Sequence, residues 1–461
     1  MATTLVIAGA SSGVGKTTFA TGLVLALKNR GRKVQPFKVG PDYLDPTYHS
    51  RASGLPSRNL DTWMLPPQNL LELYQRVAKS VDICLVEGVM GLYDGKNGRD
   101  EDGSTAALAK LLGAPVVVVM DVGKLSRTAG AIALGLQKFD PKLNLAGFLL
   151  NNVGSATHYK WVQQAIEAAT GLPVLGGLPK NRKYALPERH LGLVPAGEGL
   201  KEGELEATLA KLAEEIAHMV DLDALERLAT TASFEQTRVS PKLFPAEPLS
   251  KIVRLGLAYD AAFGFYYQDN LDLLQAWGAE IVPFSPMVDQ ELPPNLDGLY
   301  IGGGFPEVFA RDLAANQAMH QAIREFAWQG LPVYAECGGL MYLCQALVDF
   351  EGRVYPMVGL LPYRTVMQNR RLKIGYAEAS ACSGHPLVEP GTILRGHEFH
   401  WSLLESDFDP VSAAYLIPAQ GNRPEGWLHG NVLASYLHLH FGSDHRLAPR
   451  LVQWCAENRI G

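Results

Sequence analysis

A glycine-rich segment near the N-terminus contains the residue types that hold phosphate groups. Residues 9–18 read Gly-Ala-Ser-Ser-Gly-Val-Gly-Lys-Thr-Thr, and they lie between a predicted strand at 3–8 and a predicted helix at 19–28. Gly13 and Gly15 allow backbone N–H groups to turn toward phosphate oxygens, and the N-terminus of the helix adds its dipole. The order of strand, glycine loop and helix therefore predicts a P-loop.

Three consecutive side chains at the end of this loop complete the predicted nucleotide site. In a P-loop the lysine, here Lys16, reaches the β and γ phosphates, and the hydroxyl of Thr17 ligates Mg²⁺. Thr18 follows and is assigned to the same site. The first motif position is Ala10 instead of glycine, which is a small departure. We therefore expect ATP and Mg²⁺ as cofactors.

A cysteine occupies a second place where a strand is expected to turn into a helix. Cys337 lies between two apolar runs, and the small residues Ala335 and Gly339 permit a tight turn there. This is the layout of a nucleophile elbow, in which the helix N-terminus is expected to lower the thiol pKa and a thiolate can attack an amide carbonyl. A lone cysteine is more often a core residue, and we interpret the other four that way: Cys84, Cys344, Cys382 and Cys455.

Glycines and histidines elsewhere in the C-terminal half could complete a site around this thiol. Gly303 and Gly304 follow a predicted strand, and their N–H groups, with that of Gly338, are candidates for an oxyanion hole. His438 and His440 are two residues apart on a predicted strand, so both point to one face and either could act as general base. The residues alone do not separate the two histidines, and we favour His438.

Carboxylates follow predicted strands of the N-terminal region. Asp42 and Asp45 come shortly after one strand, Glu87 ends the next, and Asp94 lies a few residues beyond it. Open α/β sheets bind ligands at the carboxyl ends of their strands, and Mg²⁺ needs one or two carboxylates besides the P-loop threonine. Each acid alone could equally be a solvated loop residue or a helix cap. As a set they predict a metal site in which Glu87 and Asp42 join Thr17.

The elements that must position these residues alternate as in an α/β protein. Apolar runs alternate with helix-length segments in the first third, which predicts a mostly parallel, doubly wound sheet. Its predicted strands are residues 3–8, 33–38, 82–87, 115–120, 145–150 and 173–178. The rhythm restarts at 252–258, 280–284, 298–301 and 332–335, and strand-like runs beyond 354 are expected to extend this second sheet with antiparallel strands.

A break in the pattern divides the chain. Apolar residues at helical spacing between 205 and 220 predict a packed helix, and the segment 230–250 is rich in Ser, Thr and Pro. We therefore expect an ATP-binding domain at 1–195, a helical linking segment at 196–250 and a second α/β domain at 251–461.

Composition excludes several classes of protein. The 461 residues are 47% hydrophobic and 19% charged, as in a folded globular protein. Lys and Arg total 41 against 47 Asp and Glu, and the net charge of −6 gives no basic field for nucleic acid or a membrane surface. Apolar runs are shorter than the ~18 residues that span a bilayer. The five cysteines form no CxxC pair, and no signal-peptide pattern is visible, so we expect a cytoplasmic protein without a disulfide framework.

Four longer motifs carry a resemblance to a known family. They are residues 35–46, 87–95, 187–193 and 395–400. Together with the P-loop and the cysteine turn, they make nearly the whole chain resemble the cobyrinic acid a,c-diamide synthase family of corrinoid biosynthesis. The resemblance implies a P-loop domain like that of dethiobiotin synthetase, followed by a domain like the class I glutamine amidotransferases.

The resemblance also implies a reaction. Glutamine would be hydrolysed in one domain, and the a and c side-chain carboxylates of cobyrinate or hydrogenobyrinate would be amidated with ATP in the other. Cys337 would be the nucleophile and His438 the histidine that activates it, with L-glutamine and a corrinoid tetrapyrrole as partners. The wider amidotransferase class has a glutamate two residues after this histidine, where this chain has His440, so a Cys–His dyad is expected.

The chemistry of amidation suggests roles for the remaining residues. A carboxylate is a poor acyl donor, so transfer of the γ-phosphoryl group would make an acyl phosphate that ammonia displaces. Asp45 and Asp94 are expected to face the carboxylate being activated, and Tyr43 and Leu44 to contact the tetrapyrrole.

Other functions stay open at this point. A cobyric acid synthase shares both domains, and a nickel-bearing sirohydrochlorin could replace the corrinoid as the substrate of an a,c-diamide synthase. A non-enzymatic P-loop switch is a more distant alternative, and it would have no use for Cys337. The sequence does not give the metal content of the ring, the order of amidation or the oligomeric state, for which a homodimer is one option.

Overall fold

The computed structural model describes residues 2–180, 188–189, 192–193, 203–231, 242–370, 372–405 and 412–459. The chain divides into two units, Met1–Ser240 and Pro241–Gly461, and the division falls inside the Ser-, Thr- and Pro-rich segment. Three residues of the family-like stretch 187–193 lie outside the described residues, and the other four form two short paired strands, β8 (Glu188–Arg189) and β9 (Gly192–Leu193). The expected domain limits at 195 and 250 stay predictions.

The first unit is built on a sheet whose central strands are apolar along their length. β5 (Val116–Asp121) carries four consecutive valines, as expected for a parallel strand covered on both faces. Seven strands run parallel in the spatial order β3 (Arg58–Leu60), β2 (Val34–Val39), β4 (Ile83–Glu87), β1 (Thr3–Gly9), β5, β6 (Leu145–Val153) and β7 (Val174–Pro179). β10 (Thr230–Thr231) pairs antiparallel with β1. The predicted parallel sheet and its six predicted strands are confirmed.

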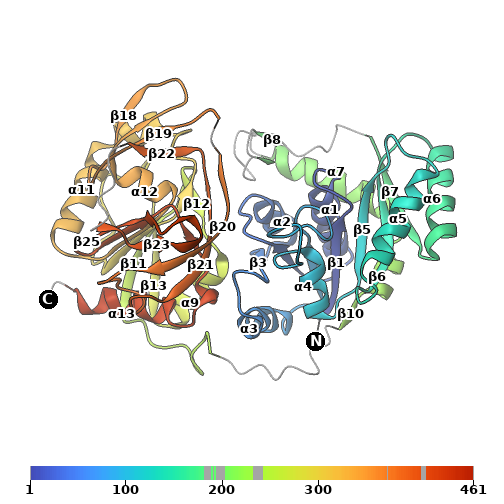
Figure 1. The fold of residues 1–461 in the computed structure, drawn as a ribbon, viewed down its shortest axis with the longest axis horizontal. Helices are drawn as coiled ribbons and strands as arrows, with labels where there is room; N and C mark the ends of the chain where they lie inside the picture. The colour runs from blue at the N-terminus through green and yellow to red at the C-terminus, as the bar shows by residue number, and fades with distance from the viewer. Residues whose placement is uncertain are drawn as a thin grey trace. The chain divides into compact units, whose positions relative to one another are not determined.

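Helices connect these strands. They are α1 (Lys16–Asn29), α2 (Asp45–Ser53), α3 (Pro67–Ala78), α4 (Thr105–Leu112), α5 (Thr128–Phe139), α6 (Ala156–Thr170), α7 (Glu204–Met219) and α8 (Leu222–Leu228). Ser104 and Ser155 cap α4 and α6, because each side chain accepts a hydrogen bond from a backbone N–H of the first turn. α5 and α6 lie side by side in the cyan and green part of Figure 1.

Helix α7 is part of the first unit because its apolar face packs against α1. Leu212 and Ile216 are fully buried and lie against Gly22 of α1. A Cβ atom at Gly22 would come within 2.7 Å of Ile216 and 3.0 Å of Leu212, so the absence of a side chain there lets the two helices approach. The described helices of the segment expected to link two domains therefore contribute to the core of the first unit.

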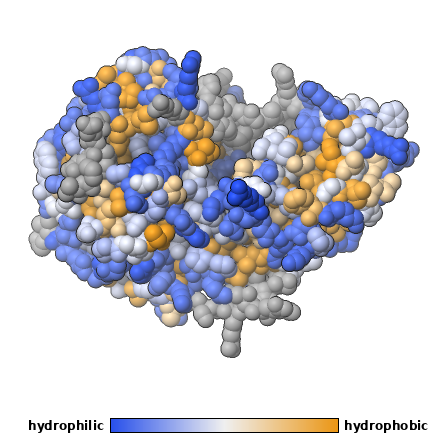
Figure 2. Space-filling model, in the orientation of Figure 1, coloured by the Kyte–Doolittle hydropathy of each residue, from blue (hydrophilic) through white to orange (hydrophobic). Residues whose placement is uncertain are grey.

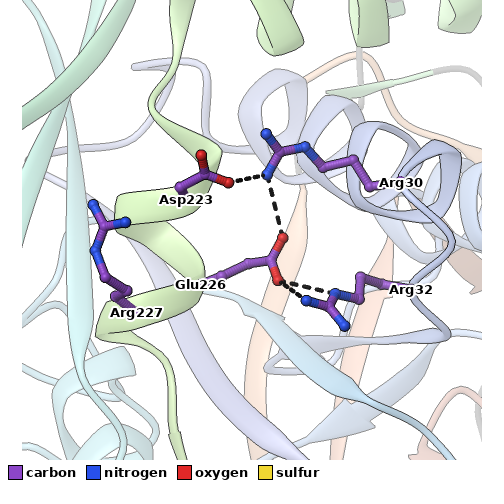
Figure 3. A pocket seen from close by; sticks show the side chains of 5 residues that line it. All are labelled: Arg30, Arg32, Asp223, Glu226 and Arg227. Carbon is purple, nitrogen blue, oxygen red and sulfur yellow. Dashed lines mark hydrogen bonds and ion pairs between the residues drawn. The ribbon is translucent and has the colours of Figure 1, made fainter.

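Ion pairs connect α8 to the residues that follow α1. Arg30 Nη1 lies 2.7 Å from Asp223 Oδ1 and 3.3 Å from Glu226 Oε1, and Arg32 Nη2 lies 2.7 Å from Glu226 Oε2 (Figure 3). With Arg227, these residues line a surface hollow of about 690 Å³. Exposed ion pairs of this kind stabilise a fold by only about 0–1 kcal/mol each. We assign the cluster to the attachment of α8 and to no ligand.

The second unit also contains a parallel sheet. Its strands are, in spatial order, β13 (Ala279–Phe284), β11 (Val253–Ala258), β14 (Gly298–Ile301), β16 (Val333–Glu336), β26 (Val432–Ser435) and β25 (Trp427–His429). All neighbours are parallel except the last pair. The helices are α9 (Gln268–Ala276), α10 (Ala310–Ala315), α11 (Gln317–Trp328), α12 (Gly338–Leu343) and α13 (Leu447–Glu457). The four strands predicted here are confirmed as β11, β13, β14 and β16.

Further sheets lie beside this parallel sheet, and most of their strand pairs are antiparallel. One has the order β18 (Val354–Pro356), β17 (Cys344–Val348), β19 (Leu361–Met367) and β22 (Ser402–Glu405). Another has the order β24 (Arg423–Glu425), β23 (Tyr415–Ile417), β20 (Lys373–Ala381), β21 (Ile393–His400) and β27 (His438–Leu439). β12 (Phe263–Phe265) pairs with β15 (Gly303–Gly304). Among the described residues, β25 is therefore the one antiparallel strand that extends the parallel sheet, and the other strands form separate sheets.

Hydrophobic residues are scattered among hydrophilic ones on the face shown in Figure 2. The most exposed large apolar side chains include Phe139, Val288 and Trp328, which lie on α5, after β13 and at the end of α11. Isolated exposed apolar side chains are common on folded proteins and need no partner. None of the described helices has both the length and the apolar character needed to cross a membrane.

Shortening Leu212 tests the packing of α7 on α1. Leu212→Ala should lower the free energy of unfolding by ~2–5 kcal/mol, because it removes buried apolar surface and leaves a cavity. The neighbouring Lys211 is exposed, so Lys211→Ala should change it by less than ~0.5 kcal/mol. Urea unfolding followed by circular dichroism measures both. Equally small effects would show that α7 is not packed in the core.

Candidate functional site

The P-loop turn is shaped by two glycines and braced from β6. Gly13 and Gly15 have φ angles of 72° and 98°, and α1 begins at Lys16. Asn151 Nδ2 donates to the carbonyl oxygen of Val14 at 2.9 Å, and it lies where a side chain at Gly15 would have to fit. Asn151 therefore helps to hold the loop in shape, although no sequence motif had marked it.

The Lys16 ammonium group lies over the loop backbone. Its Nζ donates to the carbonyl oxygen of Met90 at 2.6 Å and to that of Ser11 at 3.3 Å. Burial, reinforced by the nearby charge of Lys38, holds the pKa of Lys16 below its ordinary value. Thr18, in the first turn of α1, is half-buried. The loop thus has the shape and the cation that phosphate binding requires.

Five side chains converge beside the P-loop. Thr17 Oγ1 donates to Glu87 Oε1 at 2.7 Å and to Asp45 Oδ2 at 3.2 Å. Lys38 Nζ lies 2.5 Å from Asp45 Oδ2 and 2.9 Å from Glu87 Oε1. His49 Nε2 lies 2.6 Å from Glu87 Oε2. Lys38 and Glu87 meet because they are paired in register on the parallel strands β2 and β4, next to the ends of both strands.

The charges of this cluster depend on one another. Burial alone would lower the pKa of Lys38, but the carboxylates of Asp45 and Glu87 outweigh it and raise that pKa. Burial would raise the pKa of Glu87, but Lys38 and His49 outweigh it and lower that pKa. Burial and the charge of Asp42 raise the pKa of Asp45 well above its ordinary value. Lys38 and Glu87 therefore form a buried ion pair, and Asp45 shares the Lys38 ammonium group.

The oxygen atoms of the cluster fit a magnesium ion. The hydroxyl of Thr17 lies within 3.2 Å of carboxylate oxygens of Glu87 and Asp45. The described residues contain no group of three His, Cys, Asp or Glu side chains that could hold a metal ion by themselves. Mg²⁺ usually takes one or two protein carboxylates and completes its shell with phosphate oxygens and water. This donor set therefore fits Mg²⁺ that arrives with a nucleotide.

Asp42 makes the contacts of a helix cap. Its Oδ1 accepts hydrogen bonds from the backbone N of Leu44 at 2.8 Å and of Asp45 at 3.2 Å, at the start of α2. Its Oδ2 lies 3.8 Å from Lys38 Nζ. Tyr43 is half-buried and Leu44 is buried beside it. Metal ligation by Asp42 stays a prediction, and capping is the role that its contacts describe.

Asp94 closes the turn that follows β4. Its Oδ2 accepts a hydrogen bond from the backbone N of Gly91 at 2.9 Å. A Cβ atom at Gly91 would lie 3.4 Å from the carbonyl oxygen of Ala10, so this turn lies against the P-loop. The charge of Asp94 also acts on Lys16, whose pKa it tends to raise. Asp94 therefore belongs to the same site as the P-loop.

In the second unit, Cys337 lies at a tight turn from β16 into α12. Its φ of 47° and ψ of −100° are rarely adopted by a residue with a side chain, and such a conformation costs ~1–3 kcal/mol. The backbone N of Cys337 donates to the carbonyl oxygen of Ser435 at 2.7 Å, and the thiol contacts the carbonyl oxygen of Phe399 at 3.7 Å. The strand-to-helix turn predicted at this cysteine is confirmed.

The expected lowering of the Cys337 pKa is wrong for this structure. Burial raises the thiol pKa, and the negative charge of Glu307 raises it further. The backbone N–H of Gly338 acts in the opposite direction but does not outweigh them. α12 has only six residues, so its dipole is short, and the thiol is buried. The resting thiol is therefore protonated and needs a base.

Glycine residues lie around the turn that carries the thiol. A Cβ atom at Gly338 would lie 3.0 Å from the backbone N of Gly304. A Cβ atom at Gly303 would lie 2.5 Å from Cε1 of His438. The His438 ring stacks on His397, with centroids 4.7 Å apart and planes at 14°. The structure thus brings the three predicted oxyanion-hole glycines together with His438.

The two candidate histidines have different surroundings. Burial, reinforced by His400, lowers the pKa of His438 to about 3, although Glu398 acts in the opposite direction. The imidazole of His438 is therefore neutral near pH 7. His440 Nδ1 accepts a hydrogen bond from the backbone N of Gly442 at 3.0 Å, and its Nε2 lies 3.8 Å from Asp269 Oδ2. These contacts favour His438 as the general base, which stays a prediction.

Comparisons with known proteins match both units. Residues 5–194 match the CobQ/CobB/MinD/ParA nucleotide binding domain, and residues 254–446 match the CobB/CobQ-like glutamine amidotransferase domain. The predicted pairing of a P-loop domain with an amidotransferase domain is therefore confirmed.

Relatives match nearly the whole chain. A protein from Dehalococcoides mccartyi named cobyrinate a,c-diamide synthase is 47% identical over 453 residues, which cover 97% of each chain. Proteins of the same name from Listeria monocytogenes and Priestia megaterium are 45% and 41% identical, over 95% and 98% of this chain and 96% of theirs. The chain belongs to the cobyrinate a,c-diamide synthase family.

Proposed function

We propose that this protein uses ATP and glutamine to convert the a and c side-chain carboxylates of cobyrinate or hydrogenobyrinate into amides. The observation that carries the proposal is that one chain combines two half-sites. One is a P-loop beside the oxygen cluster of Thr17, Glu87 and Asp45. The other is a strained cysteine turn beside a neutral histidine. The names of the full-length relatives supply the substrate.

Glutamine hydrolysis follows from the second half-site. His438 takes the proton of the Cys337 thiol, and the thiolate attacks the side-chain amide carbon of glutamine. The N–H groups of Gly304 and Gly338 stabilise the oxyanion that forms, in a place where Gly303 leaves room for the histidine. His438 returns the proton to the departing ammonia. Water, deprotonated by His438, then cleaves the thioester and releases glutamate.

Amide synthesis follows from the first half-site. The P-loop N–H groups and Lys16 hold the phosphates of ATP, and a substrate carboxylate oxygen attacks the γ phosphorus, so that ADP leaves. Ammonia then attacks the acyl phosphate, and phosphate departs. Thr17 and Glu87 would hold Mg²⁺, which would supply positive charge to the phosphates. Most of this catalysis consists of positioning and electrostatic stabilisation.

Lys38 keeps the acids of this half-site in place. Its buried ammonium group keeps Glu87 ionised and forms an ion pair with Asp45. Asp45 and Asp94 then handle the carboxylate being activated, and Tyr43 and Leu44 contact the tetrapyrrole from the start of α2. Asp42 supports this segment through its cap and is a further candidate near the metal. A cytoplasmic location and a homodimer stay predictions.

Product masses test the proposed reaction. The purified protein is incubated with ATP, Mg²⁺, glutamine and a panel of tetrapyrrole acids that includes cobyrinate, hydrogenobyrinate and nickel-sirohydrochlorin. We expect two successive conversions of acid to amide on a corrinoid. Amidation of the nickel compound alone, or of other corrinoid side chains, would contradict the assigned substrate.

Removing the thiol should separate the two half-reactions. Cys337→Ala should lower glutamine-driven synthesis by at least ~10³-fold, because no other group can form the thioester. Synthesis from a high concentration of ammonium salt should stay within about threefold of wild type, since amide formation does not use the thiol. Loss of both activities in a folded variant would refute this division of labour.

A methyl group at Gly303 should disturb the glutaminase half-site alone. Gly303→Ala places a Cβ atom 2.5 Å from His438 Cε1, so the histidine must move. A displacement of this size should cost ~10²-fold in glutamine hydrolysis. Gly264→Ala is the matched control, since its nearest atom would be at 3.8 Å. Glutamate release measures both, and equal activities would show that His438 does not need its present position.

Removing the buried cation should affect the other half-site. Lys38→Met leaves the Glu87 and Asp45 carboxylates without their buried partner, which should lower the free energy of unfolding by ~3–5 kcal/mol. ATP-dependent synthesis should be lost even with ammonium salt. Lys33→Met is the control, because Lys33 is exposed just before the same strand. Wild-type stability of Lys38→Met in urea unfolding would contradict the ion pair.

A further inference from the structure

The carboxyl group next to the thiol makes a contact that neither half-reaction explains. Glu336 ends β16 and is almost completely buried. Its Oε1 accepts hydrogen bonds from the backbone N of Leu439 at 3.0 Å and from the hydroxyl of Tyr334 at 2.6 Å. Glu336 directly precedes Cys337, and Leu439 directly follows His438. One side chain therefore connects the segment of the nucleophile with the segment of the base.

The backbone that carries His438 pairs with β21 and also donates hydrogen bonds to side chains. β26 ends at Ser435, and the chain then leaves the parallel sheet. Four N–H groups between residues 436 and 441 donate to side-chain oxygens: Tyr436 to Glu425, Leu437 to Ser435, Leu439 to Glu336 and Phe441 to Asn270. A buried N–H without an acceptor is costly, so each contact restricts the path of the backbone. The contact of Leu439 with Glu336 lies next to His438 in sequence, as does that of Leu437 with Ser435, and it comes from the residue that precedes Cys337.

Aromatic side chains fix the position of the Glu336 carboxyl group. Tyr300 donates its hydroxyl to Glu336 Oε2 at 3.0 Å. The rings of Tyr300 and Tyr334 lie 5.1 Å apart, and Phe441 lies 6.1 Å and 5.9 Å from them. Burial raises the pKa of Glu336 to about 7, although the three donors act in the opposite direction. Hydroxyl groups can rotate, so an oxygen stays available to Leu439 whether or not the carboxyl group is protonated.

We propose that Glu336 is a positioning residue that sets the place of His438 relative to Cys337 by holding the backbone at Leu439. The proposal rests on the proposed glutamine hydrolysis. In the wider amidotransferase class an acid two residues after the histidine orients its ring, and this chain has His440 there. Here the carboxyl group belongs to Glu336, the residue before Cys337. It accepts a hydrogen bond from the backbone next to His438. The Glu336 carboxyl group acts by accepting a hydrogen bond at a fixed position. Its charge contributes less to this role than its position does.

Three substitutions separate geometry from charge. Glu336→Gln keeps the length of the side chain and an acceptor oxygen, so the kcat of glutamine hydrolysis should stay within about fivefold of wild type. Glu336→Asp keeps the charge but withdraws the acceptor, and Glu336→Ala removes it, so kcat should fall by ~10²-fold in both, with KM within about threefold. Synthesis from ammonium salt should not change in any variant.

A matched control separates positioning from general stability. Asp297 Oδ2 accepts a hydrogen bond from the backbone N of Arg254 at 2.7 Å, in the same unit but between β11 and the residue just before β14. Asp297→Ala should therefore lower stability without changing kcat at a temperature where the variant is folded. The pH profile of Cys337 alkylation by iodoacetamide gives a second readout, because a displaced His438 should change it in Glu336→Ala and Glu336→Asp only.

Each outcome decides the proposal. It is overturned if Glu336→Asp is as active as wild type, if Glu336→Gln is as impaired as Glu336→Ala, or if Asp297→Ala shows the same loss of kcat. Should Glu336→Ala fail to fold, the comparison of Glu336→Gln with Glu336→Asp still decides between geometry and charge. A wild-type protein without glutaminase activity would instead refute the proposed function, which keeps the two failures distinct.

Discussion

A parallel strand that is buried on both faces leads into a turn only at its ends. Both candidate sites lie at such strand ends. The P-loop begins where β1 ends, Lys38 and Glu87 lie at the ends of β2 and β4, and Cys337 follows β16. Strand ends combine a rigid sheet with backbone N–H and C=O groups that the sheet does not use. In each unit, the candidate site residues therefore lie at the carboxyl-end edge of a rigid sheet. Neighbouring strands bring together there residues that are far apart in sequence.

The two edges are electrostatically different. In the first unit a buried ammonium group lies between carboxylates, so the site holds fixed charges that suit phosphates and a metal ion. In the second unit burial keeps both partners neutral, since it raises the pKa of Cys337 and lowers that of His438. In the proposed glutamine hydrolysis, the thiol proton would pass to the imidazole, and charge would develop only during the reaction.

Local patterns predicted the elements and the turns, whereas contacts between distant residues could not be predicted. Gly13, Lys16 and Cys337 were found because their chemistry depends on neighbours in sequence. The contact of Lys38 with Glu87 joins residues 49 positions apart, and that of Glu336 with Leu439 joins residues 103 positions apart. Such pairs follow from strand order, which a single sequence does not specify. The prediction for the Cys337 pKa was wrong for a related reason. Burial depends on residues distant in sequence, and its effect on the pKa outweighs that of the neighbouring helix.

We propose that one protein takes nitrogen from glutamine and places it on two carboxylates. Mass spectrometry can follow this nitrogen directly. The protein is incubated with ATP, Mg²⁺, cobyrinate and glutamine labelled with ¹⁵N at the side-chain amide, in a buffer that contains unlabelled ammonium at low concentration. We predict a diamide in which both new amide groups carry ¹⁵N. A product with unlabelled amides, or glutamate release without amide formation, would contradict the account.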